Sequence, residues 1–255
     1  MSARRVAVLA DIHGNLPALE AVLADVERSP VDRVVLNGDM LLGPMPGETM
    51  ERLLALGDAA VWVRGNSERE LVEAMDARLG ASLPEHLRAI AGYGAAHVDR
   101  RHRGLLAGLP LSAVVEVDGL GPVRFCHATA GNDVDIVLVD SPVDRWQASF
   151  AGVEEPVVVL GHTHMPFDRL VDRRRFVNPG SVGMPYGTPG AHWAVLGPDV
   201  VLRTTAYDVN AAAERLARTG FPGIEGFVAE NVRAVPSDSE ALAAFSPRPP
   251  TPGSP

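Results

Sequence analysis

Residues 9–15 read LADIHGN: an apolar run ends at Asp11, a histidine follows two positions later, and Gly and Asn come next. The residues at 4–10, RRVAVLA, have the apolar character of a buried strand. Asp, Gly and Asn are ordinary turn residues, so this stretch alone is explained equally well by a strand that runs into a turn. The residues that follow the other strands decide between a turn and a functional site.

The chain before residue 67 alternates apolar strands with amphipathic helices. The hydrophobic pattern predicts strands at 4–10, 32–37 and 58–63 and helices at 16–29 and 47–57. Helices that connect successive strands in this way predict a parallel sheet covered by helices. Residues 67–110 have a helical pattern with Gly and Arg breaks, which indicates a helical insertion or cap.

From residue 112 onward the pattern is typical of β-hairpins. We expect a hairpin at 112–128, a strand at 154–161, antiparallel pairs at 167–180 and 191–207, and a helix at 208–220. Parallel strands first and antiparallel strands later predict two packed sheets with helices outside. We therefore expect one domain over 1–220, with the insertion at 67–110, and a C-terminal extension over 221–255 that ends in a disordered Pro-rich tail, SPRPPTPGSP.

Composition limits the class of protein and its partners. The 255 residues are 46% hydrophobic, which is enough to bury one large core. A formal net charge of −9 argues against bulk nucleic acid as a partner, because such binding draws on clustered Lys and Arg. Cys126 is the only cysteine, and the sequence has neither a signal-peptide pattern nor an apolar run that could span a bilayer. We expect a cytoplasmic protein with no membrane partner.

Metal-capable side chains follow five separate strands at their C-terminal ends, where ligands bind in α/β sheets. They are two carboxylates, one amide and four imidazoles: Asp11, His13, Asp39, Asn66, His127, His162 and His164. Seven ligands are too many for one ion and suit two, if one carboxylate bridges. Oxygen and imidazole donors favour Mn, Fe, Zn, Co or Ni, with Mn our first choice. Two such ions would activate a water and hold both oxygens of a phosphoryl transfer, so the set predicts metal-assisted hydrolysis.

Two members of this set also have a simpler explanation. His127 could end a strand as a buried core histidine, and Asn66 could be a left-handed turn residue after Gly65. The acidic net charge is no obstacle to an anionic substrate, because two divalent ions beside two carboxylates leave the pocket with about two positive charges.

The motifs DIHGN, NGD, RGNSE, CHA, GHTH and NPGS occur in this order between residues 5 and 205. Together they resemble the calcineurin-like metallophosphoesterase family, especially its compact bacterial and archaeal phosphodiesterase branch and the related diadenosine-tetraphosphatase-like proteins. The resemblance implies an α/β fold, a four-layer α/β/β/α sandwich of two mixed sheets with outer helices.

The resemblance also implies roles for the ligands. It assigns Asp11, His13 and His164 to one metal, Asn66, His127 and His162 to the other, and Asp39 to the bridge between them. It further implies that a hydroxide bridging the two ions is the nucleophile, and that the amide of Asn66 also contacts the phosphate.

The chain departs from the family pattern at two places. Where much of the family has GNHE or GNHD, residues 65–68 are GNSE, so Ser67 stands where a histidine would protonate the leaving group. A hydroxyl is a poor general acid, and we expect weak hydrolysis of esters with poor leaving groups but better turnover of activated aryl diesters or pyrophosphates. Residues 37–44, NGDMLLGP, lack the arginine of GDxxDRG, which disfavours protein phosphatase activity. The predicted catalytic residues are Asp39, Asn66 and Ser67.

Three residues are candidate substrate contacts: Asn15, Arg69 and Tyr186. Each has a plainer alternative, since Asn15 could cap the following helix and the other two could be a solvated charge and an ordinary packing residue. Asn178 in the NPGS motif is expected to hydrogen-bond the metal-binding loops. His86 lies in the insertion and is expected at the surface.

Two functions are consistent with these motifs. The first is a binuclear metal-dependent phosphohydrolase acting on a phosphodiester, nucleotide or dinucleoside polyphosphate. The second is a metal-binding interaction scaffold of the same fold with weak or no turnover, which the missing histidine suggests. The full ligand set favours the enzyme, because grouping two carboxylates and four imidazoles without a cation is costly. The expected partner is a small-molecule phosphoester or nucleotide, and a homo-oligomer stays open.

Overall fold

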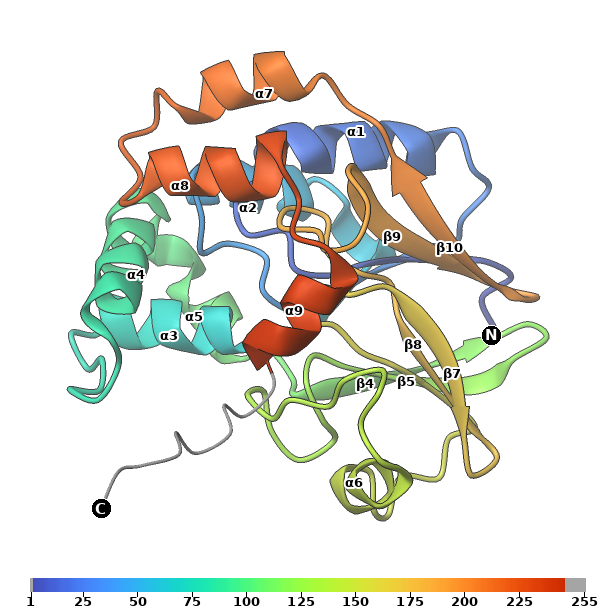
Figure 1. Ribbon diagram of the computed structural model, residues 1–255. Helices are drawn as coiled ribbons and strands as arrows, with labels where there is room; N and C mark the ends of the chain where they lie inside the picture. The colour runs from blue at the N-terminus through green and yellow to red at the C-terminus, as the bar shows by residue number, and fades with distance from the viewer. Residues whose placement is uncertain (1, 246–255) are drawn as a thin grey trace.

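The computed structural model describes residues 2–245, which form two five-stranded mixed sheets (Figure 1). In the first sheet the strand order is β10-β9-β1-β2-β3. Strands β1 (Val6–Leu9), β2 (Arg33–Asn37) and β3 (Ala60–Val63) are parallel. Strand β9 (Ala191–Leu196) runs antiparallel to β1 and pairs with β10 (Val200–Thr205).

The second sheet has the order β4-β5-β6-β8-β7. A hairpin joins β4 (Ser112–Val117) to β5 (Gly121–Cys126), and a second hairpin joins β7 (Phe167–Val171) to β8 (Arg174–Asn178). Strand β6 (Val157–Val159) lies between the hairpins and is parallel to both of its neighbours, β5 and β8. The expected α/β fold with two mixed sheets is therefore confirmed.

The change from parallel to antiparallel strands along the chain does not coincide with the change from one sheet to the other. The antiparallel pair at the end of the chain, β9 and β10, returns to the first sheet, and the second sheet contains parallel pairs. The pairing of β9 with β1 has a physical reason. Without β9, the backbone N–H and C=O groups on the edge of β1 that faces away from β2 would be buried without hydrogen-bond partners. Strand β9, which is buried over its whole length, pairs with that edge.

Alternate side chains of the inner strands enter different apolar layers, because neighbouring residues of a strand point to opposite faces. Val6 and Val8 of β1 pack between the sheets with Phe125 of β5, whereas Ala7 and Leu9 pack beneath the helices. A third apolar cluster lies on the far face of the second sheet. Three apolar layers separate four layers of secondary structure.

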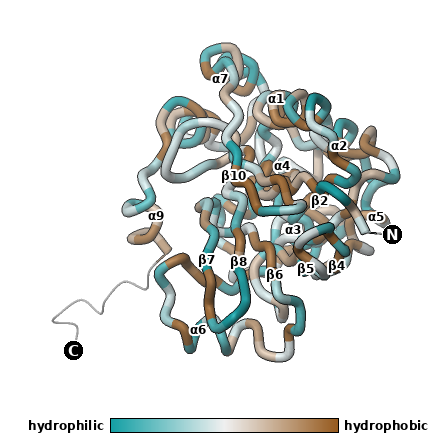
Figure 2. The backbone as a smooth tube through the Cα atoms, turned by 90° about the vertical axis from the view of Figure 1, so that its right-hand side faces the viewer, coloured by the Kyte–Doolittle hydropathy of each residue, from teal (hydrophilic) through white to brown (hydrophobic). Residues whose placement is uncertain are grey.

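The outer layers consist of helices. The first sheet is covered by α1 (Leu16–Glu27), α2 (Pro46–Leu54), α7 (Val209–Leu216) and α8 (Ile224–Val228), and the second by α6 (Val143–Ser149). The side view in Figure 2 shows α1, α2 and α7 at one end of this stack and α6 at the other. Among residues 2–245, no helix combines the length and apolar content needed to cross a bilayer.

The segment between β3 and β4 is helical, as its pattern predicts. It contains α3 (Asn66–Met75), α4 (Glu85–His97), a short turn of 3-10 helix (Arg100–His102) and α5 (Arg103–Ala107). A second 3-10 turn (Gly57–Ala59) precedes β3. A π-helical turn (Ala229–Arg233) follows α8, and α9 (Asp238–Phe245) ends the described chain. The Pro-rich stretch at 246–255, predicted to be disordered, lies outside the described residues.

Candidate metal centre

The loops that follow strands of both sheets bring the seven predicted ligands into one region. Asp11 follows β1 and Asp39 follows β2, while Asn66 begins α3 just after β3. His127 follows β5, and the GHTH loop that carries the last two histidines follows β6. Because the parallel strands of each sheet end on the same side, residues more than a hundred positions apart in the chain meet there.

Asp11, His13 and His164 form the first group of possible metal ligands. His164 Nε2 lies 3.2 Å from Asp11 Oδ1 and 3.2 Å from His13 Nε2. His13 Nε2 lies 4.0 Å from the same carboxylate oxygen. One atom from each side chain thus points to a common centre, as a shared cation requires.

Asp39, His127 and His162 form the second group. Asp39 Oδ1 lies 3.3 Å from His127 Nε2, and the rings of His127 and His162 are 5.1 Å apart. The other oxygen of Asp39, Oδ2, lies 3.7 Å from His13 Nε2 in the first group. The Asp39 carboxylate therefore stands between the two groups, with one oxygen turned toward each.

Each of the four imidazoles is oriented by a backbone carbonyl. The Nδ1 atoms of His13, His127 and His164 lie 3.1, 2.9 and 2.9 Å from the carbonyl oxygens of Leu42, Asn37 and Met184. His162 uses Nε2 instead, 3.2 Å from the carbonyl of Val134. A nitrogen that donates to a carbonyl leaves the other nitrogen of the ring free to bind a metal. His127 Nε2 is such an atom, since it is buried and has no hydrogen-bond partner.

The charges of the centre compensate one another only in part. Burial opposes ionisation of Asp11 and Asp39, but the neighbouring histidines hold the pKa of each carboxyl below its usual range. Burial alone would lower the pKa of His127, yet the carboxylates of Asp39 and Asp11 raise it to about 10. The pKa of His162 falls to about 4 because the ring is buried and close to His127. The imidazolium of His127 thus faces two buried carboxylates, and such a buried pair of negative charges favours nearby positive charge.

The backbone of these loops is unusual. Five of the eight described non-glycine residues with positive φ belong to the ligand set, with φ between 47° and 66°: Asp11, His13, Asp39, His162 and His164. Such conformations cost energy for residues with a Cβ and occur preferentially at functional sites. Position 38 also requires glycine. Gly38 has φ 86° and lies so close to the His127 ring that a Cβ there would collide with the ring.

The profile of the calcineurin-like phosphoesterase superfamily domain matches residues 5–199. The chain belongs to this superfamily. Among curated relatives, the uncharacterized protein MJ0912 of Methanocaldococcus jannaschii is 25% identical over 250 residues, covering 85% of this chain and 93% of the relative. Phosphodiesterase YfcE of Escherichia coli K12 is 26% identical over 200 residues, covering 75% of this chain and 86% of YfcE.

Solved structures agree with this assignment. The hypothetical protein PH1004 from Pyrococcus horikoshii OT3 has a TM-score of 0.76 at 25% identity and covers 90% of this chain and 97% of its own. A metallophosphoesterase from Sphaerobacter thermophilus has a TM-score of 0.72 at 25% identity, with coverages of 91% and 99%. The phosphoesterase family predicted from the motifs is confirmed.

The RGNSE motif of this phosphoesterase joins two loops of the centre. One polar atom of the Asn66 amide lies 3.2 Å from His162 Nδ1. With the amide nitrogen in this position, Asn66 donates a hydrogen bond to the ring. With the amide oxygen there, Asn66 and His162 can bind the same cation. Ser67 is buried, its N–H donates to Asp39 Oδ1 (2.9 Å), and its hydroxyl donates to Glu68 Oε1 (3.3 Å). The Ser67 hydroxyl is therefore already engaged within the protein.

Glu68 supports the loops of the centre and was not among the residues predicted from the sequence. Its fully buried carboxylate accepts the backbone N–H groups of Asp39, Met40 and Gly65 at 2.8–2.9 Å, which ties the loop after β2 to the start of α3. Burial, reinforced by the Asp39 carboxylate, raises the pKa of Glu68 to about 7. The sequence does contain a signal for this role. Glu68 stands three residues after Gly65, the residue that precedes α3, and a Glu at this position can accept the N–H groups left free at the start of a helix.

The predicted substrate contacts have different surroundings. Asn15 is fully buried; its oxygen accepts from Ala18 N–H (3.3 Å) as the cap of α1, and its nitrogen donates to the carbonyl of Gly183 (3.0 Å). Arg69 is paired with Asp133, at 3.2 Å. These contacts correspond to the helix-cap alternative for Asn15 and give Arg69 an ion-pair partner.

Two other predicted residues lie close to the metal ligands. The ring of Tyr186 is stacked on His164, with centroids 5.5 Å apart. The amide nitrogen of Asn178 donates to the carbonyl of Gly161 (2.7 Å), which confirms that Asn178 supports the GHTH loop. His86 is exposed, as expected, but it also lines a cavity that contains His13 and Asp39, a location that its sequence context did not indicate.

Proposed function

We propose that this phosphoesterase is a binuclear metal-dependent hydrolase of small-molecule phosphodiesters or nucleotides. The observation that carries the proposal is the position of Asp39, whose two oxygens lie 3.3 Å from His127 Nε2 and 3.7 Å from His13 Nε2. A carboxylate with one oxygen turned to each ligand group suits a bridge between two ions. The phosphodiesterase named among the relatives, YfcE, supports the choice of phosphodiesters.

The donors fit divalent transition metals. Each of the four imidazoles has one ring nitrogen against a backbone carbonyl, and Nε2 of buried His127 has no hydrogen-bond partner, a donor set that fits a cation. The mixed oxygen and imidazole donors do not separate Mn, Fe, Zn, Co and Ni, and we propose Mn as the ion to test first. Two ions held here would supply positive charge for the phosphoryl oxygens and a water of lowered pKa. In this proposal Asp39 sets the separation of the two sites, and Asn66 orients the phosphate.

The engaged hydroxyl of Ser67 supports a preference among substrates. Because this hydroxyl donates to Glu68 and is 2% exposed, it is poorly placed to protonate a departing alkoxide. Esters whose leaving group is stable as an anion, such as aryl diesters, should therefore react faster than alkyl esters.

An interaction scaffold is the weaker explanation. A scaffold gains nothing from two buried carboxylates held within 4 Å of several imidazoles, since burying such charges without a cation is unfavourable. The strained backbone at five of the ligands points in the same direction, because strain of this kind persists where it serves a site.

The test is hydrolysis of bis(p-nitrophenyl) phosphate, p-nitrophenyl phosphate and diadenosine tetraphosphate by the Mn-loaded protein. We expect turnover of the diester, and a loss of at least about 100-fold in kcat for Asp39→Asn, because removing one strong electrostatic contact to a transition state has this order of effect. Asp168→Asn, the same change on an exposed aspartate of β7, is the matched control and should retain activity. Two bound metals without turnover of any substrate would favour the scaffold, and a preference for the monoester would contradict the role inferred for Ser67.

A further inference from the structure

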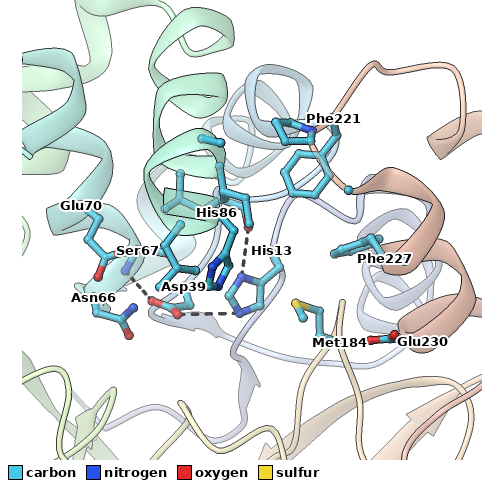
Figure 3. A pocket seen from close by; sticks show the side chains of 17 residues that line it. His13, Asp39, Asn66, Ser67, Glu70, His86, Met184, Phe221, Phe227 and Glu230 are labelled. Atoms are coloured by element: carbon cyan, nitrogen blue, oxygen red, sulfur yellow. Dashed lines mark hydrogen bonds and ion pairs between the residues drawn. The ribbon is translucent and has the colours of Figure 1, made fainter. Parts of the chain in front are cut away.

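A cavity of about 580 Å³ opens beside the candidate metal ligands (Figure 3). His13, Asp39, Asn66 and Ser67 contribute to one end of it, so any phosphate held by the metals would have its organic group at this opening. In Figure 3, Glu70 and His86 of the insertion lie on one side, and Phe221, Phe227 and Glu230 lie on the other. The cavity therefore lies between the helical insertion and the segment that contains α8.

The walls away from the metal ligands are largely apolar. Leu87 and Ile90 of α4 face the cavity from the insertion. Phe221 and Phe227 face it from the opposite side, and their rings meet edge to face at 5.8 Å and 76°. Both rings are less than a tenth exposed, so their positions are fixed by packing before any substrate arrives. Pockets of this size with apolar and aromatic walls are typical of sites for organic ligands.

The lining of the cavity is rich in carboxylates. Besides Asp39, its lining includes Glu70 and Glu230, and among the described lining residues there is no Lys or Arg. The nearby Arg69 is held by Asp133 instead. A substrate that carried further phosphates along the cavity would therefore meet carboxylates without a compensating cation, which is unfavourable.

We propose, on the basis of the proposed function, that this cavity binds the organic group of the phosphoester and that this group is uncharged and predominantly apolar, such as an aromatic ring. The reacting phosphate would remain at the metal ligands, and the ring would pack against Phe227 and Leu87. A dinucleoside polyphosphate, left open by the sequence, is disfavoured because its additional phosphates would lie beside Glu70 and Glu230.

Binding of two phosphonates to the Mn-loaded protein, measured by calorimetry, tests the apolar wall without requiring turnover. Methylphosphonate and phenylphosphonate share the anionic head and differ in the apolar group. We expect phenylphosphonate to bind at least about tenfold more tightly, since burying a ring adds several carbon atoms to the contact. Leu87→Gln should reduce this ratio to about threefold or less. The matched control is Leu105→Gln, on an exposed leucine of α5 outside the cavity, which should keep the ratio.

The acidic wall is tested with diadenosine tetraphosphate. Glu230→Gln should raise kcat/KM for this substrate about threefold or more at low salt, because it removes a like charge. Glu225→Gln, on an exposed glutamate of α8 that does not line the cavity, should change it less. Equal binding of the two phosphonates, or faster turnover of the tetraphosphate than of bis(p-nitrophenyl) phosphate, would overturn the cavity proposal while leaving the hydrolase intact. Absence of all turnover with normal phosphonate discrimination would instead count against the hydrolase alone.

Discussion

His127 is the most deeply buried imidazole among the candidate ligands, and it stands between two carboxylates. Its side chain is 0% exposed and faces Asp39 at 3.3 Å and Asp11 at 3.9 Å. In the metal-free protein a proton on this ring lies beside both carboxylates. His162, a few ångströms away, is neutral because its pKa has moved in the opposite direction.

This difference predicts proton release when metal binds. The pKa of His127 is raised from 6.5 to about 10, so at pH 8 the ring of the metal-free protein carries an extra proton, which a metal must displace. The ring of His162, with a pKa of about 4, is already neutral at pH 8 and releases no proton. Mn titrations by calorimetry in buffers of different ionisation enthalpy should show release of about one proton from these two rings at pH 8, and less above pH 10. The same binding enthalpy in every buffer at pH 8 would contradict the protonated His127.

Glu68 acts on the centre through the backbone. We predict that Glu68→Gln lowers the free energy of unfolding of the metal-free protein by about 2–4 kcal/mol, because the amide nitrogen would face backbone N–H donors in a fully buried place. Urea unfolding followed by circular dichroism measures the change. Glu70→Gln, two residues further along α3 and partly exposed, serves as the matched control and should cost less than about 1 kcal/mol. Equal stability of Glu68→Gln and the natural chain would show that Glu68 does not tie the loops together.

The outer layer on the second sheet depends on one short helix. Trp146 of α6 is fully buried, with ring centroids 4.5 Å from Phe176 and 5.9 Å from both Phe150 and Phe167. Trp146 belongs to the apolar cluster on the outer face of this sheet, and not to the layer between the two sheets. A substitution in this cluster should therefore lower the stability of the fold without changing metal binding.

Trp146→Ala tests this separation. We expect a loss of about 3–5 kcal/mol in the free energy of unfolding, the range for removing a large buried aromatic side chain. Mn affinity of the molecules that remain folded should stay within about twofold of the natural protein, since the aromatic neighbours of the deleted ring, Phe150, Phe167 and Phe176, are not candidate ligands. Denaturant unfolding and Mn titration at low temperature measure the two quantities. A parallel loss of Mn affinity would mean that the outer layer and the centre are coupled.

In the whole molecule, the metal centre is where the loops of the two sheets meet. Asp11 and Asp39 come from the first sheet and His127, His162 and His164 from the second, so bound cations would hold both sheets at once. Metal that binds only the folded chain stabilises it by mass action. Removal of metal should therefore weaken the entire fold rather than one loop.

We predict that Mn at about 100 times its dissociation constant raises stability by about 2.7 kcal/mol, and Tm by about 5–10 °C. Differential scanning calorimetry with Mn and then with excess EDTA measures the rise and its reversal. Asp39→Asn should show a smaller rise, because it removes the carboxylate between the two groups. An identical Mn-induced rise in this variant would place the bound metal elsewhere.

The sequence was sufficient to predict the α/β fold, the family and the ligand candidates, because each Asp, Asn or His follows a strand within a few residues and such motifs are local. It could not determine where the β9-β10 hairpin pairs, that Glu68 joins two loops, or that α8 forms a wall of the cavity. These depend on contacts between distant parts of the chain; the rings of His13 and His164, for example, meet across 151 positions. Only the tertiary structure decided them, because strand pairing and side-chain packing minimise unpaired backbone and exposed apolar surface over the whole chain, not within any one segment.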